Sequence, residues 1–175
     1  MLNLSLKAMK ILATLQAIVI VTSLAMGQSK PQYGFKMVKP RVSTSLSFED
    51  RFIKIQFGIL TRVIFQLTNK TANPIEILWD RVSFVDTESE AHRVIHEGVR
   101  YIERDRALPP TIIPPGASAS DSLFPTDYIS YDSKESEWKV RDLFEPSISR
   151  YKGETFSVFL PLKVNGRIAN YNFSF

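Results

Sequence analysis

The sequence predicts an all-β fold, a single antiparallel β-sandwich of about seven strands, and three observations carry this prediction. Residues 156–175 form one expected hairpin, because Asn165-Gly166 is the dipeptide that best suits a two-residue type I′ turn. Apolar and polar residues alternate in runs beginning at Ile53 and Val63, which is the period of a half-buried strand. Ten prolines and twelve phenylalanines favour a β-rich fold with rigid connections over a helical bundle.

The expected turn also sets the register of the closing hairpin. One face then pairs only apolar or aromatic residues: Leu162 with Ala169, Leu160 with Tyr171, Val158 with Phe173, and Phe156 with Phe175. A slip of one residue would turn this face outward. Pro161 falls in a non-hydrogen-bonded pair, so its strand is expected to be an edge strand or to be bulged there.

The middle of the chain supplies the remaining strands. Apolar residues between Ile75 and Asp86 change phase, which predicts one strand with a bulge near Trp79–Arg81. Residues 91–101, 111–113 and 117–124 are expected to be extended, the second because proline pairs flank it. Residues 137–144 are expected to form a helical turn or two. Strands at this spacing, with proline-rich corners, predict an immunoglobulin-like sandwich.

The chain divides into three parts by composition. Residues 1–27 have the pattern of an export signal: Lys7 and Lys10, an apolar region of 14 residues from Ile11 to Leu24, and small residues before Gln28. The alternative is an uncleaved membrane anchor. Residues 28–45 are expected to be an extended arm or linker, and residues 46–175 form the β-sandwich domain.

Charge and cysteine content exclude several classes of partner and site. Beyond residue 27 the chain has 20 basic and 18 acidic residues, a balance too even to indicate nucleic acid as a partner. The absence of cysteine excludes disulfides, thiolate metal sites, a cysteine nucleophile and a lipid anchor on an N-terminal cysteine. A membrane contact is therefore expected only through an uncleaved signal segment.

The two histidines of the chain, His92 and His96, are not expected to share a metal ion. They lie four residues apart on a predicted strand, roughly 13 Å at ~3.3 Å per residue. In the zinc-protease motif a glutamate follows the first histidine, and here Arg93 stands in that place. The sequence therefore predicts two titratable positions on a solvent-facing strand.

Basic residues gather around these histidines. Acidic residues interleave with them at Glu97, Glu103 and Asp105, so neutralising ion pairs on exposed strands are expected, with an anion or glycan contact as the alternative. The candidate interaction surface consists of His92, Arg93, His96, Arg100 and Arg104.

No sequence motif indicates catalysis or a cofactor. The acidic residues Asp80, Asp86, Glu88 and Glu90 do not have the spacing of a calcium loop. There is no Gly-x-Ser-x-Gly elbow and no glycine-rich phosphate loop. Trp79 and Trp138 are expected in the core. The sequence predicts no catalytic residue, no metal site and no cofactor.

Several segments resemble uncharacterised bacterial exported or lipoprotein-like proteins with an immunoglobulin-like β-sandwich. The resemblance rests on Phe65-Gln-Leu-Thr-Asn69, Asn73-Pro-Ile75 and Trp79-Asp80, and on these further motifs: His92-Arg-Val-Ile-His96, Ile113-Pro-Pro-Gly116 and Gly153-Glu-Thr-Phe156. It spans roughly residues 62–175 and departs from a lipoprotein in having no cysteine for the lipid. It implies the fold and brings no catalytic residue.

Together these features predict a non-enzymatic protein of the bacterial cell envelope, periplasmic or secreted after cleavage near Gly27. Its expected role is to bind or assemble with an envelope protein, by strand addition at a sheet edge. Two alternatives stay open. One is a small outer-membrane β-barrel, which Tyr171-x-Phe173-x-Phe175 at the C-terminus resembles. The other is an envelope hydrolase whose site is assembled from distant residues.

Overall fold

The computed structural model describes residues 34–144 and 151–175, and these form an all-β fold with antiparallel strand pairing. No helix among these residues is long and apolar enough to cross a membrane. The strands are β1 (Ser47–Glu49), β2 (Ile53–Ile59), β3 (Val63–Asn69), β4 (Ile75–Ile77), β5 (Ser83–Val85), β6 (Ala91–His96), β7 (Thr111–Ile113), β8 (Ser118–Pro125), β9 (Ile129–Asp132), β10 (Glu137–Val140), β11 (Ser157–Val164) and β12 (Arg167–Ser174). Short 3₁₀ turns are η1 (Trp79–Arg81), η2 (Tyr101–Glu103) and η3 (Thr126–Tyr128).

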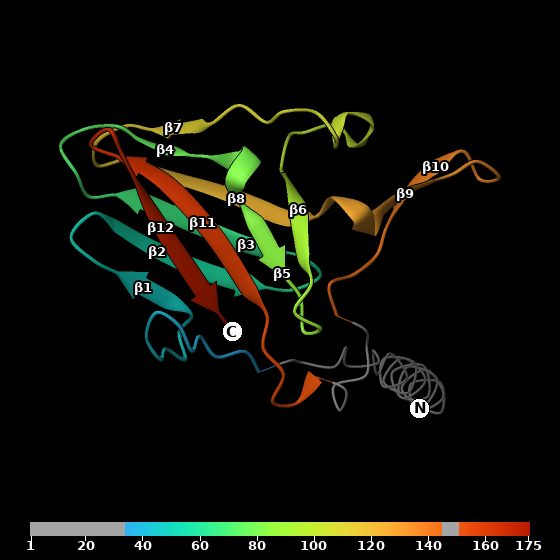
Figure 1. Ribbon diagram of the computed structural model, residues 1–175, viewed down its shortest axis with the longest axis horizontal. Helices are drawn as coiled ribbons and strands as arrows, with labels where there is room; N and C mark the ends of the chain where they lie inside the picture. The colour runs from blue at the N-terminus through green and yellow to red at the C-terminus, as the bar shows by residue number, and fades with distance from the viewer. Residues whose placement is uncertain (1–33, 145–150) are drawn as a thin grey trace, which may run out of the picture. The chain divides into compact units, whose positions relative to one another are not determined.

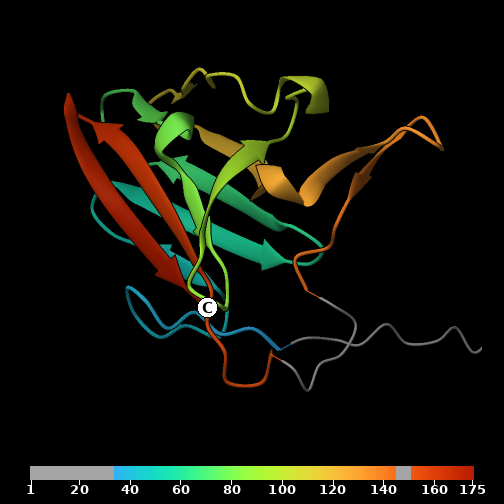
Figure 2. The same cartoon turned by 45° about the vertical axis from the view of Figure 1, so that its right-hand side comes forward.

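Two layers of strands make the sandwich (Figures 1 and 2). One layer has the order β1-β2-β3-β8-β6, and in the other β11 pairs with β12 on one side and with β4 and β5 on the other. If β4 and β5 are counted as one interrupted strand, the chain order across the two layers is that of an immunoglobulin domain. The predicted sandwich is therefore confirmed.

The strand count exceeds the predicted seven, and the reason is structural. Seven strands form the immunoglobulin pattern when β4 and β5 count together: β2, β3, β4–β5, β6, β8, β11 and β12. The short strands β1 and β7 extend the edges of the layers, and β9 and β10 pair only with each other. The extra strands are thus additions at the margins of the predicted fold.

The inner faces of both layers form the core, as strand alternation requires. In β2 and β3 every second residue is buried, from Ile53 to Ile59 and from Val63 to Asn69. Phe57 of β2 meets Phe173 and Phe175 from the other layer, with ring centroids 4.8 and 5.0 Å apart. These contacts between layers bury the aromatic residues of the closing hairpin.

The closing hairpin has the predicted turn and the predicted register throughout. Asn165 and Gly166 have φ values of 50° and 76°, as a type I′ turn requires. Every predicted pair within the strands forms, from Ser157 with Ser174 to Val164 with Arg167. Local turn chemistry and burial therefore agree on one alignment.

The bulge predicted near Trp79–Arg81 takes the form of η1. The turn shifts the side-chain phase, so Ile77 before it and Phe84 after it are both buried. Pro161 of β11 lies opposite this interruption, between the residues that pair with β4 and those that pair with β5. A proline is tolerated in this central strand because no ladder donor is needed there. The strand β11 is not an edge, and the bulge lies in its neighbour.

Strand β6 belongs to both layers. Its first half, Ala91–Arg93, pairs with β5, and its second half, Val94–His96, pairs with β8 in the other layer. This crossing places His92 beside one layer and His96 beside the other.

The predicted helical turn over residues 137–144 is wrong. Residues 137–140 form β10, which pairs with β9 in register from Glu137 with Asp132 to Val140 with Ile129. This hairpin extends away from the two layers in both views (Figures 1 and 2). Trp138, expected in the core, is half-buried on it, whereas Trp79 is fully buried as predicted.

The described part of the predicted arm, residues 34–45, lies against the sandwich. Met37 is fully buried, and the backbone N–H of Val38 donates to the carbonyl of Ser174 at 2.7 Å. The predicted signal segment, residues 1–27, lies outside the described residues.

Candidate functional site

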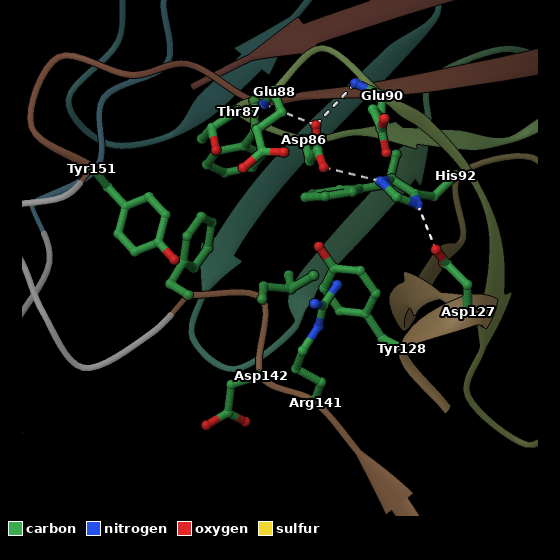
Figure 3. A pocket seen from close by; sticks show the side chains of 14 residues that line it. Asp86, Thr87, Glu88, Glu90, His92, Asp127, Tyr128, Arg141, Asp142 and Tyr151 are labelled. Atoms are coloured by element: carbon green, nitrogen blue, oxygen red, sulfur yellow. Dashed lines mark hydrogen bonds and ion pairs between the residues drawn. The ribbon is translucent and has the colours of Figure 1, made fainter. Parts of the chain in front are cut away.

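A polar pocket of about 270 Å³ opens beside the start of β6 (Figure 3). Four segments line it: the β5–β6 turn with its flanking strands, η3, the residues that follow β10, and the residues that precede β11. Its polar lining consists of Asp86, Thr87, Glu88, Glu90, His92, Asp127, Tyr128, Arg141, Asp142 and Tyr151. Residues far apart in the sequence therefore meet in one place.

Asp86 holds the turn between β5 and β6. Its Oδ1 accepts the backbone N–H groups of Glu88 and Glu90, each at 2.9 Å. Aspartate commonly closes turns in this way, by bonding the backbone two residues on. Its other oxygen, Oδ2, is left facing His92 in the pocket (Figure 3).

His92 lies between two carboxylates, and its side chain is only 10% exposed. Its Nε2 is 3.1 Å from Oδ2 of Asp86, and its Nδ1 is 2.9 Å from Oδ2 of Asp127. Burial of the ring lowers the pKa of His92, but the hydrogen bonds to Asp86 and Asp127 outweigh it, so the pKa is raised. Because both ring nitrogens face carboxylates, the geometry favours an imidazolium that donates from both of them.

The same interactions act in reverse on Asp86. Burial raises the pKa of Asp86, but the hydrogen bonds from the Glu90 N–H, from His92 and from the Glu88 N–H outweigh it, so the pKa is lowered.

The guanidinium carbon of Arg141 lies 3.7 Å from the centre of the Tyr128 ring on the opposite wall. Burial raises the pKa of the Tyr128 hydroxyl.

The predicted interaction residues do not form one surface. His92 lines the polar pocket, whereas His96 and Arg100 line a second opening together with Tyr101 and Trp138. Arg93 donates to the carbonyls of Asp105 and Arg106.

The predicted neutralising ion pairs form within the basic cluster. Arg100 and Arg106 both pair with Glu103, at 2.7 and 2.8 Å. The guanidinium of Arg104 lies over the Trp138 ring, 5.2 Å from its centre. Most of the cluster is thus engaged within the protein itself.

The prediction that both histidines lie on a solvent-facing strand is wrong, because neither side chain is freely exposed. The His96 ring stacks on the buried Trp79, with centroids 4.0 Å apart and planes 3° apart. Its Nδ1 is 3.1 Å from Oδ2 of Asp121, and its side chain is 14% exposed. Both histidines are held by carboxylates that arrive from elsewhere in the chain.

Sequence reasoning did not find Asp127, Tyr128 or Arg141, which complete the pocket. Asp127 is 35 residues from its partner His92 and belongs to a segment without periodic pattern. The only sequence signal is weak: residues 127–142 are mostly polar, with Tyr128 among them. The pairing itself requires the fold.

The outer edge of β12 is a second feature that bears on function. Phe156 and Phe175 exchange both backbone hydrogen bonds, so their neighbours Ser157 and Ser174 form a non-hydrogen-bonded pair. By the same alternation, the backbone groups of Ile168, Asn170 and Asn172 point away from β11. None of the residues in 34–144 and 151–175 pairs with these outward groups, whereas Ser174 pairs with Lys39 of the arm.

No family model matches the chain, and no curated protein matches it. Among solved structures, the chain is similar to one described as a crystal structure of a protein from Archaeoglobus fulgidus, with 8% sequence identity, a TM-score of 0.31, and coverage of 74% of this chain and 92% of that chain. A likeness of this size carries no argument about activity or partner.

Proposed function

We propose that the protein is a non-enzymatic, exported binding module of the cell envelope that takes up an extended segment of a partner protein along β12. The observation that carries this proposal is the row of outward N–H and C=O groups at Ile168, Asn170 and Asn172. Unpaired edges of this kind accept an added strand, with the backbone supplying the hydrogen bonds.

The other sheet edges are poorer docking surfaces. Strands β1 and β7 have three residues each, whereas β12 has eight. Proline pairs flank β7 on both sides, at Pro109-Pro110 and Pro114-Pro115, and proline blocks strand pairing. Short edges and prolines are the usual protections against strand addition, and β12 has neither on its outer side.

A hollow beside the first half of β12 indicates the chemistry of the docked segment. It has a volume of about 440 Å³ and is lined by Arg51, Phe52, Val164, Asn165, Arg167, Ile168 and Ala169. Two guanidinium groups beside apolar surface suit an acidic side chain next to an apolar one. We therefore assign the partner segment an extended backbone with an acidic residue, because side-chain pockets give strand addition its specificity.

The geometry of the histidines supports a role without catalysis. A general base needs a free ring nitrogen within hydrogen-bond reach of the proton that it removes. Both nitrogens of His92 face carboxylates, and neither histidine hydrogen-bonds a hydroxyl group within the described residues. The export part of the proposal rests on the composition of residues 1–27.

The decisive variant is Asn170→Pro, which removes one outward N–H. The N–H of Asn170 does not serve the ladder with β11, so the free energy of unfolding should change by no more than about 1 kcal/mol. Asn170→Ala is the matched control, because it loses the same side chain and keeps the N–H. Capture of a partner from envelope extracts should fall at least tenfold in Asn170→Pro and stay near wild type in Asn170→Ala.

Two other outcomes would contradict the proposal. Equal capture by Asn170→Pro and wild type would exclude the β12 edge. A wild-type dimer that Asn170→Pro dissociates in sedimentation would make a second copy the occupant. Mass spectrometry of the native protein tests export: a chain that begins at Gln28 in a soluble envelope fraction is expected, and an intact Met1 in the cytosol would refute it.

A further inference from the structure

Three potential metal ligands meet at the turn before β6. Single ligand atoms of Asp86, Glu90 and His92 all lie within 4.8 Å of one another. Nε2 of His92 and Oδ2 of Asp86 are 3.1 Å apart, close to the roughly 3.3 Å between two ligands of a tetrahedral zinc ion. Glu90 is exposed, so its carboxylate can rotate over the remaining distance. Imidazole nitrogen and carboxylate oxygen are both ligand types that zinc takes in proteins.

The residues around this set orient it for a metal. Metal-binding histidines usually donate their second ring N–H to a carboxylate, which fixes the tautomer and aims the other nitrogen at the ion. Asp127 stands in that place, with Oδ2 at 2.9 Å from Nδ1 of His92. The β5–β6 turn uses Oδ1 of Asp86 and leaves Oδ2 available. Asp127 comes from η3, outside the turn that carries the three ligands.

The charge of the pocket also calls for a cation. Five carboxylates line it, whereas Arg141 is its one permanently charged cationic side chain among the described residues. The chain beyond residue 27 has two more basic than acidic residues, so this local excess of negative charge opposes the overall balance. A proton on His92 offsets one of these charges, and a divalent ion in its place would offset two.

We propose that Asp86, Glu90 and His92 bind one divalent cation of the zinc class, with Asp127 as the residue that positions His92. The imidazole nitrogen selects such an ion over calcium or magnesium, which prefer oxygen ligands alone. All three ligands line the pocket, so the bound ion keeps a coordination position there for water or an anionic group. This site lies apart from the β12 edge and does not depend on the proposed function.

In the sequence, the ligands of this site belong to two separate patterns. Asp86 and Glu90 lie in an acidic run without the spacing of a calcium loop, and His92 lies four residues before His96. The ligand set combines both patterns, because the turn between β5 and β6 folds the acidic residues back over the strand that carries the histidine.

Zinc titration of the purified, tag-free protein by calorimetry tests the proposal. We expect one saturable site per chain with a Kd in the micromolar range or tighter, and binding of calcium at least 100-fold weaker. The variant Glu90→Gln should weaken zinc binding at least tenfold. Its matched control is Glu88→Gln, an exposed residue of the same turn with the same loss of charge, which should change the affinity less than threefold.

The variant His92→Gln provides the second test and should also weaken zinc at least tenfold. Far-ultraviolet circular dichroism with a chelator present shows that each variant is folded. Three results would overturn the proposal: no saturable zinc binding below 100 micromolar, equal losses in Glu90→Gln and Glu88→Gln, or affinity unchanged in His92→Gln. Equal losses would mean that the acidic pocket attracts cations without a defined site.

Discussion

Two aspartate–histidine pairs lie at the two ends of β6, and the first is at the polar pocket. Asp86 closes the turn before the strand with Oδ1, which accepts the backbone N–H groups of Glu88 and Glu90. Its Oδ2 is 3.1 Å from a ring nitrogen of His92. The aspartate therefore has a structural oxygen and an oxygen that faces the imidazole.

The second pair, at the end of the strand, is built in the same way. Oδ1 of Asp121 accepts the backbone N–H groups of Glu97 and Ser122, at 3.0 and 2.7 Å. Oδ2 of Asp121 is 3.1 Å from a ring nitrogen of His96. The difference lies in what surrounds each ring. His96 stacks flat on the buried Trp79, whereas His92 meets a second carboxylate in an open pocket.

This comparison shows that an aspartate–histidine pair is not by itself a functional site. The pair at His96 is explained by packing, because the ring covers an indole and the carboxylate caps two backbone groups. The pair at His92 has two additions that packing does not require: Asp127 on the second nitrogen and Glu90 within reach. Those additions make it the candidate site.

The largest expected effect comes from removing the surface on which His96 stacks. Trp79→Ala deletes a fully buried indole whose N–H donates to Thr111 Oγ1 at 2.8 Å. It should lower the free energy of unfolding by about 3–5 kcal/mol, measured by chemical denaturation. The matched control is Trp138→Ala on the β9–β10 hairpin, which should cost no more than about 1.5 kcal/mol. Similar losses in both would contradict the division between core and hairpin.

Next in size is the loss of the His96 ring itself. His96→Ala removes a side chain that is 14% exposed and leaves Oδ2 of Asp121 without its partner. We expect a loss of about 2–3 kcal/mol in the free energy of unfolding, because packing and a hydrogen bond disappear together. Zinc affinity should be unchanged in this variant. A fall in zinc affinity would show that the two ends of β6 are not independent.

The smallest effect, and the most specific, is a pH dependence at the other end of the strand. The folded protein raises the pKa of His92, so protonated His92 stabilises the folded state. This stabilisation is complete below about pH 6.5, the ordinary pKa of histidine, and is lost as the pH rises through the folded pKa. The folded protein lowers the pKa of Asp86, so ionised Asp86 also stabilises the folded state. This second stabilisation is lost as the pH falls through the folded pKa of Asp86. The carboxylates facing His92 are Asp86, Asp127 and the exposed Glu90, and the Tyr128 ring meets the imidazole edge-on with centroids 5.6 Å apart.

This dependence can be measured with a chelator present, so that no metal competes for His92. His92→Gln should lower the free energy of unfolding by about 1–2 kcal/mol at pH 5.5 and by less at pH 8.5. The control Asp127→Asn separates the two carboxylates, because Asp127 is the more exposed partner of His92 and its loss should change the pH dependence little. A difference between wild type and His92→Gln that does not depend on pH would show that the ring acts by packing alone.

Much of the fold could be predicted from the sequence wherever the determinants are local. Asn165-Gly166 specifies its turn, and the alternation on either side specifies the register, so the closing hairpin was predicted pair by pair. The change of phase between Ile77 and Phe84 likewise located η1, because only a bulge brings both residues to one core.

The errors arose where partners come from distant parts of the chain. Residues 137–140 have no strong alternation, and their pairing with β9 around the turn at Lys134 and Ser136 decided that they form a strand. The histidines were expected to face solvent, because nothing near them in the sequence announces Asp121 or Asp127. Those carboxylates lie 25 and 35 residues further on and reach the histidines only in the folded sheet.

The crossing of β6 between the layers has a mechanical consequence. In a sandwich held only by contacts between side chains, the layers can part while each keeps its hydrogen bonds. Here Arg93 and Val94 are adjacent residues, yet the ladder of one belongs to β5 and that of the other to β8. The layers cannot separate at this point without tearing one of the two ladders. Strand β6 therefore joins the two layers through backbone hydrogen bonds, and a force applied at the turn of Asp86 is borne by both sheets.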